Sequence, residues 1–83
     1  MDDSLIRTPK QLGAAIRRRR KTLGLTQTDL AGRAGLRQAT ISQIERGENT
    51  RLDSLLGVLA VLDLELAVRA RTRADKDEIG RIF

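Results

Sequence analysis

Five side chains near the middle of the chain have the types and the spacing to contact the edges of DNA bases. They are Arg37, Gln38, Ala39, Ser42 and Gln43. On a short helix these positions share one exposed face, where glutamine can pair with adenine, arginine with guanine, and an alanine methyl group can contact that of thymine. Ordinary solvated helices carry the same residue types. The prediction of base contacts therefore depends on the whole pattern and not on any one residue.

A second group of side chains is suited to the phosphate backbone. Thr26 and Gln27 would begin a helix, and the N–H groups at a helix N-terminus favour anions. Arg17 to Lys21 are five consecutive cations. They wrap more than one helical turn, so we expect at least two to contact phosphate and the others to be solvated. Arg46 has two alternatives, a phosphate contact or an ion pair with Glu48 or Glu45. The predicted phosphate contacts are Arg17, Arg18, Thr26, Gln27, Thr40 and Arg46, with Thr40 nearest the flank.

The chain lacks the side chains on which many catalytic and metal sites depend. It has no cysteine and no histidine, which removes thiol nucleophiles, the usual zinc ligands and the commonest general base. Ser42 has no histidine to activate it, and no glycine-rich phosphate loop follows a strand. We therefore expect no enzyme activity, no cofactor and no bound metal.

Charge and hydropathy narrow the class of partner. The formal net charge is +5, which indicates a polyanionic partner or a basic face. Phe83 is the single aromatic residue. Proteins that bind single-stranded nucleic acids usually stack the bases on aromatic rings, so the composition favours duplex DNA as the partner. No apolar run approaches the roughly 20 residues of a membrane span, and the first residues are acidic where a secretory signal is basic. We expect a cytoplasmic protein without a membrane partner.

Caps and glycines around these residues predict two short helices. The first helix would be capped by Thr26 and end at Gly35. The second helix would run from Gln38 to about Arg46 and end at Gly47. The apolar positions that would face inward are Leu30, Ala31, Ala34, Ile41 and Ile44. Two short helices joined at a glycine are the layout of a helix-turn-helix.

Two further helices should flank this pair. Thr8, Pro9 and Gln11 form a capping box with a proline at the first helical position, which predicts a helix to about Leu23. Its apolar stripe consists of Leu12, Ala15, Ile16 and Leu23. Thr50 and Asp53 predict the start of a last helix, which is rich in leucine and would anchor the core. Its inward leucines would be Leu52, Leu55, Leu56, Leu59 and Leu62.

After Asp63 the apolar period changes to two residues, as in a half-buried strand. The alternating positions are Leu64, Leu66, Val68 and Ala70. A strand needs a partner, and the chain offers no second candidate. The simplest partner is therefore the same segment of another copy, related by a two-fold axis. The alternatives are that the segment extends the preceding helix or folds back as coil over the core.

The predicted organisation is all-α, with four to five helices and one strand paired across a homodimer. An arm covers residues 1–8, the helix-turn-helix domain 9–63, the dimerisation strand 64–71 and a flexible tail 72–83. A chain of 83 residues buries a thin core, which dimerisation would supplement. In the tail, Ile79, Ile82 and Phe83 have helical spacing, so they either dock on a partner protein or belong to a frayed end.

The segment from Gly24 to Gly47 resembles the lambda-repressor-like (Cro/cI, or XRE) family, whose second helix of the pair enters the major groove. Within that family the chain is similar to the HipB-type antitoxins of HipBA toxin–antitoxin modules, over about Thr8 to Arg71. The residues that carry this likeness are Pro9-Lys-Gln-Leu12, Gly24-Leu-Thr-Gln27, Arg37-Gln-Ala-Thr-Ile-Ser42 and Leu62-Asp-Leu-Glu-Leu66. Arg37 departs from the family pattern, because many members have a Ser or Thr cap there. The helix that begins at Gln38 therefore either starts uncapped or uses Arg37 to contact a base or a phosphate.

This resemblance implies a homodimer with paired C-terminal strands, a palindromic operator in the chain's own promoter, and a HipA-like serine/threonine kinase toxin held inactive. Two other interpretations stay open. The chain could be a stand-alone repressor without a toxin, or an adaptor that uses the same fold without binding DNA.

Overall fold

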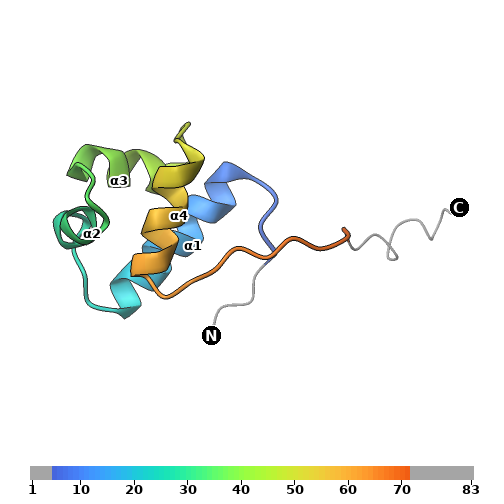
Figure 1. The fold of residues 1–83 in the computed structure, drawn as a ribbon, viewed down its shortest axis with the longest axis horizontal. Helices are drawn as coiled ribbons and strands as arrows, with labels where there is room; N and C mark the ends of the chain where they lie inside the picture. Colours follow the sequence, from blue (N-terminus) through green and yellow to red (C-terminus); the bar gives the residue numbers. More distant parts are fainter. Residues whose placement is uncertain (1–4, 72–83) are drawn as a thin grey trace, which may run out of the picture.

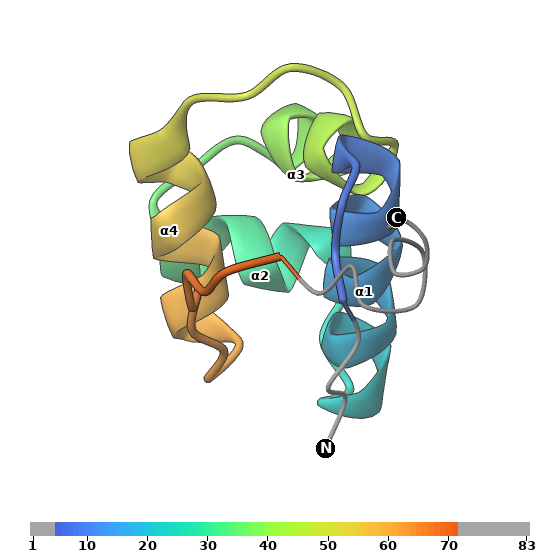
Figure 2. The same ribbon diagram turned by 90° about the vertical axis from the view of Figure 1, so that its right-hand side faces the viewer.

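Four α-helices make up the regular structure of residues 5–71, which are the residues that this computed structural model describes (Figure 1). They are α1 (Pro9–Thr22), α2 (Gln27–Ala34), α3 (Gln38–Glu45) and α4 (Leu52–Val61). Figure 2 shows α1 and α4 on opposite sides of the domain, with α2 and α3 between them. The predicted all-helical helix-turn-helix architecture is confirmed.

Local sequence chemistry sets the start of α1. The Thr8 hydroxyl accepts a hydrogen bond from the Gln11 backbone N–H at 3.1 Å, and the Gln11 side-chain oxygen accepts one from the Thr8 N–H at 3.2 Å. Pro9 follows the cap, where its missing N–H costs no hydrogen bond. The predicted capping box is therefore confirmed, and it fixes where α1 begins beside α3.

The core lies where the four helices meet. Ile16 comes from α1, and Leu62 directly follows α4; both side chains are fully buried. The remaining buried apolar side chains are Leu30, Ala31, Ile41, Ile44, Val58 and Leu59. Because α3 buries Ile41 and Ile44 on one side, its other side is fixed toward solvent.

Two glycines allow α1 to approach α3 closely. A Cβ atom at Gly13 would lie 2.5 Å from the backbone oxygen of Ile44, and one at Gly47 would lie 2.7 Å from the Cα of Lys10. Gly47 also has a φ of +79°, a conformation that side chains other than glycine rarely adopt. The C-terminal end of α3 is thereby held directly against the first turns of α1.

Several predicted core positions were wrong. Leu23 is 42% exposed, because α1 ends at Thr22 and the chain turns there, so that Leu25 packs against the core instead. Leu52 and Leu56 are 63% and 43% exposed, because burial in α4 is concentrated in its second half. These two leucines are four residues apart and form an apolar stripe on the surface of α4.

The predicted cap of α4 was also wrong. Its N-cap is Arg51, without a side-chain hydrogen bond to the backbone, and Thr50 lies one residue outside the helix. Arg51 instead donates to the Asp53 carboxylate, at 3.0 Å from Nη2. An ion pair next to the first turn, with Asp53 near the positive end of the helix dipole, takes the place of a hydroxyl cap.

The segment 64–71 forms neither helix nor strand in the single chain, and Figure 1 shows it running away from the end of α4. Asp63 has a φ of 59°, and the Leu64 N–H donates to the Leu59 carbonyl at 2.8 Å. This left-handed cap ends α4, so the segment does not extend the helix. Leu64 packs against the core, whereas Leu66 and Val68 are 55% and 93% exposed. Residues 1–4 and the tail 72–83 lie outside the described part.

Candidate nucleic-acid interface

The turn between α2 and α3 is built by a cap and a glycine. The Thr26 hydroxyl accepts from the Asp29 N–H at 2.9 Å, and the Asp29 carboxylate accepts from the Thr26 N–H at 3.0 Å. Both hydrogen bonds lower the pKa of Asp29 and keep its charge next to the N-terminus of α2. Gly35 ends α2 at φ 69° and turns the chain toward α3. Local sequence therefore fixes the start of α2 and the turn that leads into α3.

The outer face of α3 gathers the residues predicted to contact bases. Arg37, Gln38, Ala39 and Gln43 are exposed, and Ser42 is partly buried. Arg37 is the N-cap of α3 and makes no side-chain capping bond, so α3 begins without a hydroxyl cap, one of the two possibilities expected for this position. The structure thus brings all five side chains to the solvent side of one short helix.

A chain of hydrogen bonds crosses from α3 to α1. The Gln38 amide nitrogen donates to the Gln27 side-chain oxygen at 2.5 Å, and the Gln27 amide nitrogen donates to Glu45 at 3.1 Å. The Glu45 carboxylate also accepts hydrogen bonds from Nε and Nη2 of Arg20, at 2.6 and 3.0 Å. A side chain on the outer face is in this way oriented by an ion pair in the interior.

The Arg20–Glu45 pair is buried, with only 9% and 3% of the two side chains exposed. Burial alone would raise the pKa of Glu45, but the hydrogen bonds from Arg20 and Gln27 outweigh it and hold that pKa below its usual value. Arg20 also donates to the Leu25 carbonyl at 2.9 Å, which satisfies another of its donors. Such a buried pair is maintained because each charge has more than one hydrogen-bond partner, Glu45 and Leu25 for Arg20, and Arg20 and Gln27 for Glu45.

Arg46 and Glu48 form a second ion pair, on the solvent side of α3. Arg46 Nε donates to Glu48 at 2.8 Å, and Nη1 donates to the Ser42 hydroxyl. Both charged side chains are about half exposed. Of the two carboxylates expected as alternatives for Arg46, Glu48 is therefore the partner. The contact with Ser42 places Arg46 at the edge of the α3 outer face.

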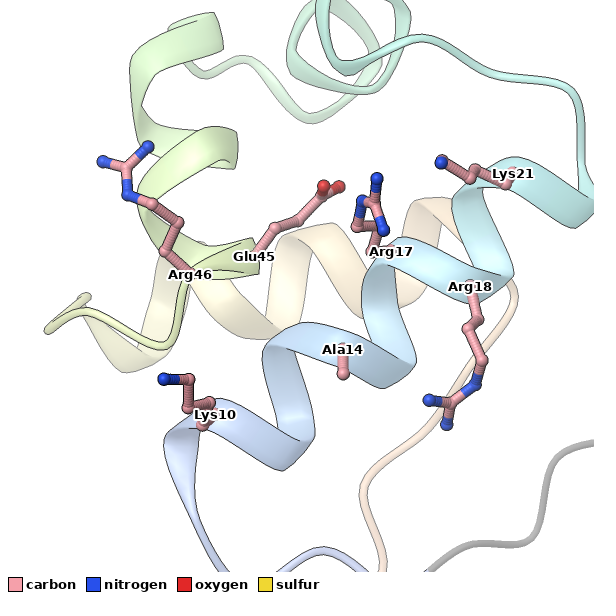
Figure 3. A pocket seen from close by; sticks show the side chains of 7 residues that line it. All are labelled: Lys10, Ala14, Arg17, Arg18, Lys21, Glu45 and Arg46. Atoms are coloured by element: carbon pink, nitrogen blue, oxygen red, sulfur yellow. The ribbon is translucent and has the colours of Figure 1, made fainter.

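Next to this edge lies a basic hollow of about 530 Å³ between α1 and the end of α3 (Figure 3). Figure 3 shows Arg17 directed toward Glu45, whereas Arg18 points away from α3. The residues that line the hollow are Lys10, Ala14, Arg17, Arg18, Lys21, Glu45 and Arg46. Five of the seven are cations, so the hollow has the electrostatics of an anion site.

Neither a metal site nor a membrane span emerges from residues 5–71. Within that range no group of three or more acidic side chains could hold a metal ion together. No helix of the described range is long and apolar enough to cross a membrane.

Comparison with known proteins decides the family. The family model HTH_3, a helix-turn-helix, matches residues 16–68. The antitoxin HipB of Escherichia coli (strain K12) is 38% identical over 64 residues, which cover 76% of this chain and 73% of HipB. The chain belongs to the HipB family of helix-turn-helix proteins.

Solved structures agree with this assignment. A complex of a HipB variant with an O2 20-mer has a TM-score of 0.79 to this chain at 33% identity, and covers 86% of this chain and 100% of that one. A HipA–HipB–O2–O3 complex has a TM-score of 0.77 at 34% identity, covering 83% of this chain and 99% of that one. The HipB-type resemblance seen in the sequence is confirmed.

Arg20 is a buried residue of this candidate site that the sequence interpretation missed. It belongs to the run of cations from Arg17 to Lys21, which we assigned to phosphate contacts and solvent. One signal was present, because Leu12, Ile16 and Arg20 recur every four residues and share the inner face of α1. The acidic partner lies 25 residues away on another helix, so spacing alone did not identify it.

The other predicted positions divide by location. Thr26 and Gln27 stand at the start of α2, and Thr40 is partly buried on the flank of α3. Arg17 and Arg46 lie beside the outer face, and Arg18 is turned from it (Figure 3). Ala70 is exposed, like Leu66 and Val68. Ile79, Ile82 and Phe83 lie outside the described residues.

Proposed function

We propose that this chain is a dimeric antitoxin that binds duplex operator DNA through α3, represses its own operon and neutralises a HipA-like serine/threonine kinase. The observation that carries the proposal is the outer face of α3 in a chain of the HipB family. On this face Gln38 donates to Gln27, which in turn donates to Glu45. An ordered glutamine on an exposed helix is suited to bidentate pairing with adenine.

The proposed base contacts are Arg37, Gln38, Ala39, Ser42 and Gln43. Thr26 and Gln27 present the N-terminus of α2 to a phosphate, and Arg17 and Arg46 lie on the same side. Arg18 is also proposed as a phosphate contact, although Figure 3 shows its side chain pointing away from α3. The structural relatives include HipB complexes with O2, O3 and O4 and with HipA, which supports operator DNA and a HipA-like protein as partners.

Dimerisation completes the proposal. Within residues 5–71, four apolar side chains stay exposed to solvent on α4 and the segment after it, and a second copy of the chain would bury them. They are Leu52, Leu56, Leu66 and Val68. In the proposed dimer the segments 64–71 pair as strands. Two copies of α3 would then meet successive major grooves of a palindromic operator, about 34 Å apart.

The DNA half is tested by fluorescence anisotropy with a duplex from the chain's own promoter and a shuffled duplex of equal length. Gln38→Ala should weaken the promoter complex by about tenfold or more and leave the shuffled complex nearly unchanged. Gln27→Ala should act in the same direction because it releases Gln38. Equal losses on both duplexes would show that Gln38 does not contact bases.

The antitoxin half is tested with the HipA-like kinase encoded beside this chain, if its operon holds one. The kinase should co-purify with the full chain in the presence of nuclease and lose activity when the chain is added. Binding to the promoter without binding to the kinase would instead support a stand-alone repressor. Failure to bind either DNA duplex would support an adaptor.

A further inference from the structure

The basic hollow between α1 and α3 contains none of the proposed base contacts, yet it adjoins the face that carries them. Arg46 links the two regions, because it lines the hollow and also donates to Ser42 on the outer face of α3. Glu45 also connects the two regions, because it lines the hollow and accepts a hydrogen bond from Gln27. Gln27 in turn accepts a hydrogen bond from Gln38 on the outer face. Any duplex that contacts Gln38 and Ser42 therefore has part of its backbone near the hollow.

The hollow is lined along α1 by a regular stripe. Lys10, Ala14, Arg17 and Lys21 are separated by four, three and four residues, so they share one face of the helix. The stripe extends over about 16 Å of helix. Its three cations are exposed, and Ala14 between them has a side chain small enough for a phosphodiester to approach the helix closely.

The dimensions of DNA make this stripe a match for one strand. The major groove is about 12 Å wide, so a helix of 10 to 12 Å diameter fills it and has a phosphate strand on either side. Each strand carries one phosphate per about 3.4 Å of duplex axis, so a stripe of this length meets several of them. Side chains beside an inserted α3 are therefore within reach of backbone and not of bases.

We infer that the α1 stripe of Lys10, Arg17 and Lys21 is a second phosphate-binding region, on which one strand of the operator lies across Ala14. The inference rests on the proposed DNA-binding function and extends it from α3 to α1. The carboxylate at the floor of the hollow does not oppose it, because Glu45 is neutralised by Arg20. The stripe adds affinity for any sequence and does not select one.

Alanine variants on α1 provide a matched test. Lys10→Ala, Arg17→Ala and Lys21→Ala are compared with Arg18→Ala, which removes a neighbouring cation that points away from α3 (Figure 3). Binding of promoter and shuffled duplexes is measured by anisotropy between 50 and 300 mM KCl. Each stripe variant should weaken both duplexes by the same factor, about five- to tenfold near 0.1 M salt, and reduce the salt slope by about 0.9. Because Arg18 points away from α3, Arg18→Ala should reduce affinity and salt slope less than any of the three stripe variants.

A charge placed at Ala14 tests the path of the strand. Ala14→Glu should weaken both duplexes by at least tenfold, whereas Ala14→Gln, of nearly the same size, should have a much smaller effect. Both replacements are exposed and helix-compatible, and circular dichroism checks that the fold is kept. Equal affinities and salt slopes for the stripe variants, Arg18→Ala and wild type would overturn the inference. Failure of the wild-type chain to bind either duplex would instead overturn the proposed function.

Discussion

Two ion pairs lie at the C-terminal end of α3, one on its inner side and one on its outer side. The inner pair joins Arg20 and Glu45 across two helices, with 9% and 3% of the side chains exposed. The outer pair joins Arg46 and Glu48, two residues apart, with 56% and 49% exposed. The Nε–oxygen distances are 2.6 and 2.8 Å, so burial and not geometry separates the pairs.

This difference in burial implies different roles. The buried pair cannot exchange its partners for water without a large free-energy cost, so it fixes the position of Glu45 and, through Gln27, that of Gln38. The exposed pair is screened by salt and competes with solvent, so Arg46 can leave Glu48 for a phosphate. In the proposed DNA interface, the inner pair would order the outer face of α3 before DNA binds, and the outer pair would supply a cation to the phosphate backbone.

The largest expected effect comes from breaking the inner pair on one side. Glu45→Ala leaves the Arg20 guanidinium buried without its carboxylate, which should lower the free energy of unfolding by about 3 to 5 kcal/mol. A small domain has only about 5 to 15 kcal/mol in total. Urea unfolding followed by circular dichroism measures the loss. Glu48→Ala is the control, and similar losses in both variants would contradict the distinction between the pairs.

Sequence alone predicted the local parts of this design. The capping box of Thr8 and Gln11 involves residues within one turn, and the glycine hinge at Gly35 needs only its neighbours. The inward positions Ile41 and Ile44 followed from helical spacing. In each case the physical cause lies within a few residues, so the pattern contains it.

The non-local parts were not predictable in the same way. Arg20 stands in a run of cations and pairs with a residue of another helix, which only the packing of α1 on α3 brings close. The exposure of Leu52 depends on how much of α4 the rest of the domain covers. The pairing of segments 64–71 requires a second chain, so it stays a proposal in which exposed Leu66 and Val68 are the supporting observation.

Replacing both members of the inner pair separates stability from function. Arg20→Met with Glu45→Leu removes both charges and keeps apolar volume, so most of the stability lost in Glu45→Ala should return. Gln27 then lacks its acceptor, and Gln38 loses its fixed orientation. Promoter binding should therefore fall by about tenfold while the midpoint of urea unfolding stays near that of wild type. If promoter affinity also recovered, the ion pair would have no orienting role.

Acid should weaken the inner pair. The pKa of Glu45 is lowered in the folded chain, so at mildly acidic pH the unfolded chain binds more protons. The stabilisation is complete above the unfolded pKa, about 4.3, and is lost as pH falls through the lower folded value. Between pH 6 and 3, wild type should lose more stability than the Arg20→Met, Glu45→Leu variant. Other carboxylates titrate in both proteins, so parallel losses would exclude Glu45 as the source.

The smallest expected effect is on the outer pair. Glu48→Gln removes the acid that holds Arg46, so Arg46 is free to contact phosphate and duplex affinity should rise by about two- to fivefold. Stability should hardly change, because both side chains face solvent. The gain must vanish when Arg46→Ala is added, since the two residues act through one contact. A gain in affinity that persisted without Arg46 would mean that Glu48 repels DNA directly. The outer pair would then not control whether Arg46 contacts the DNA phosphates.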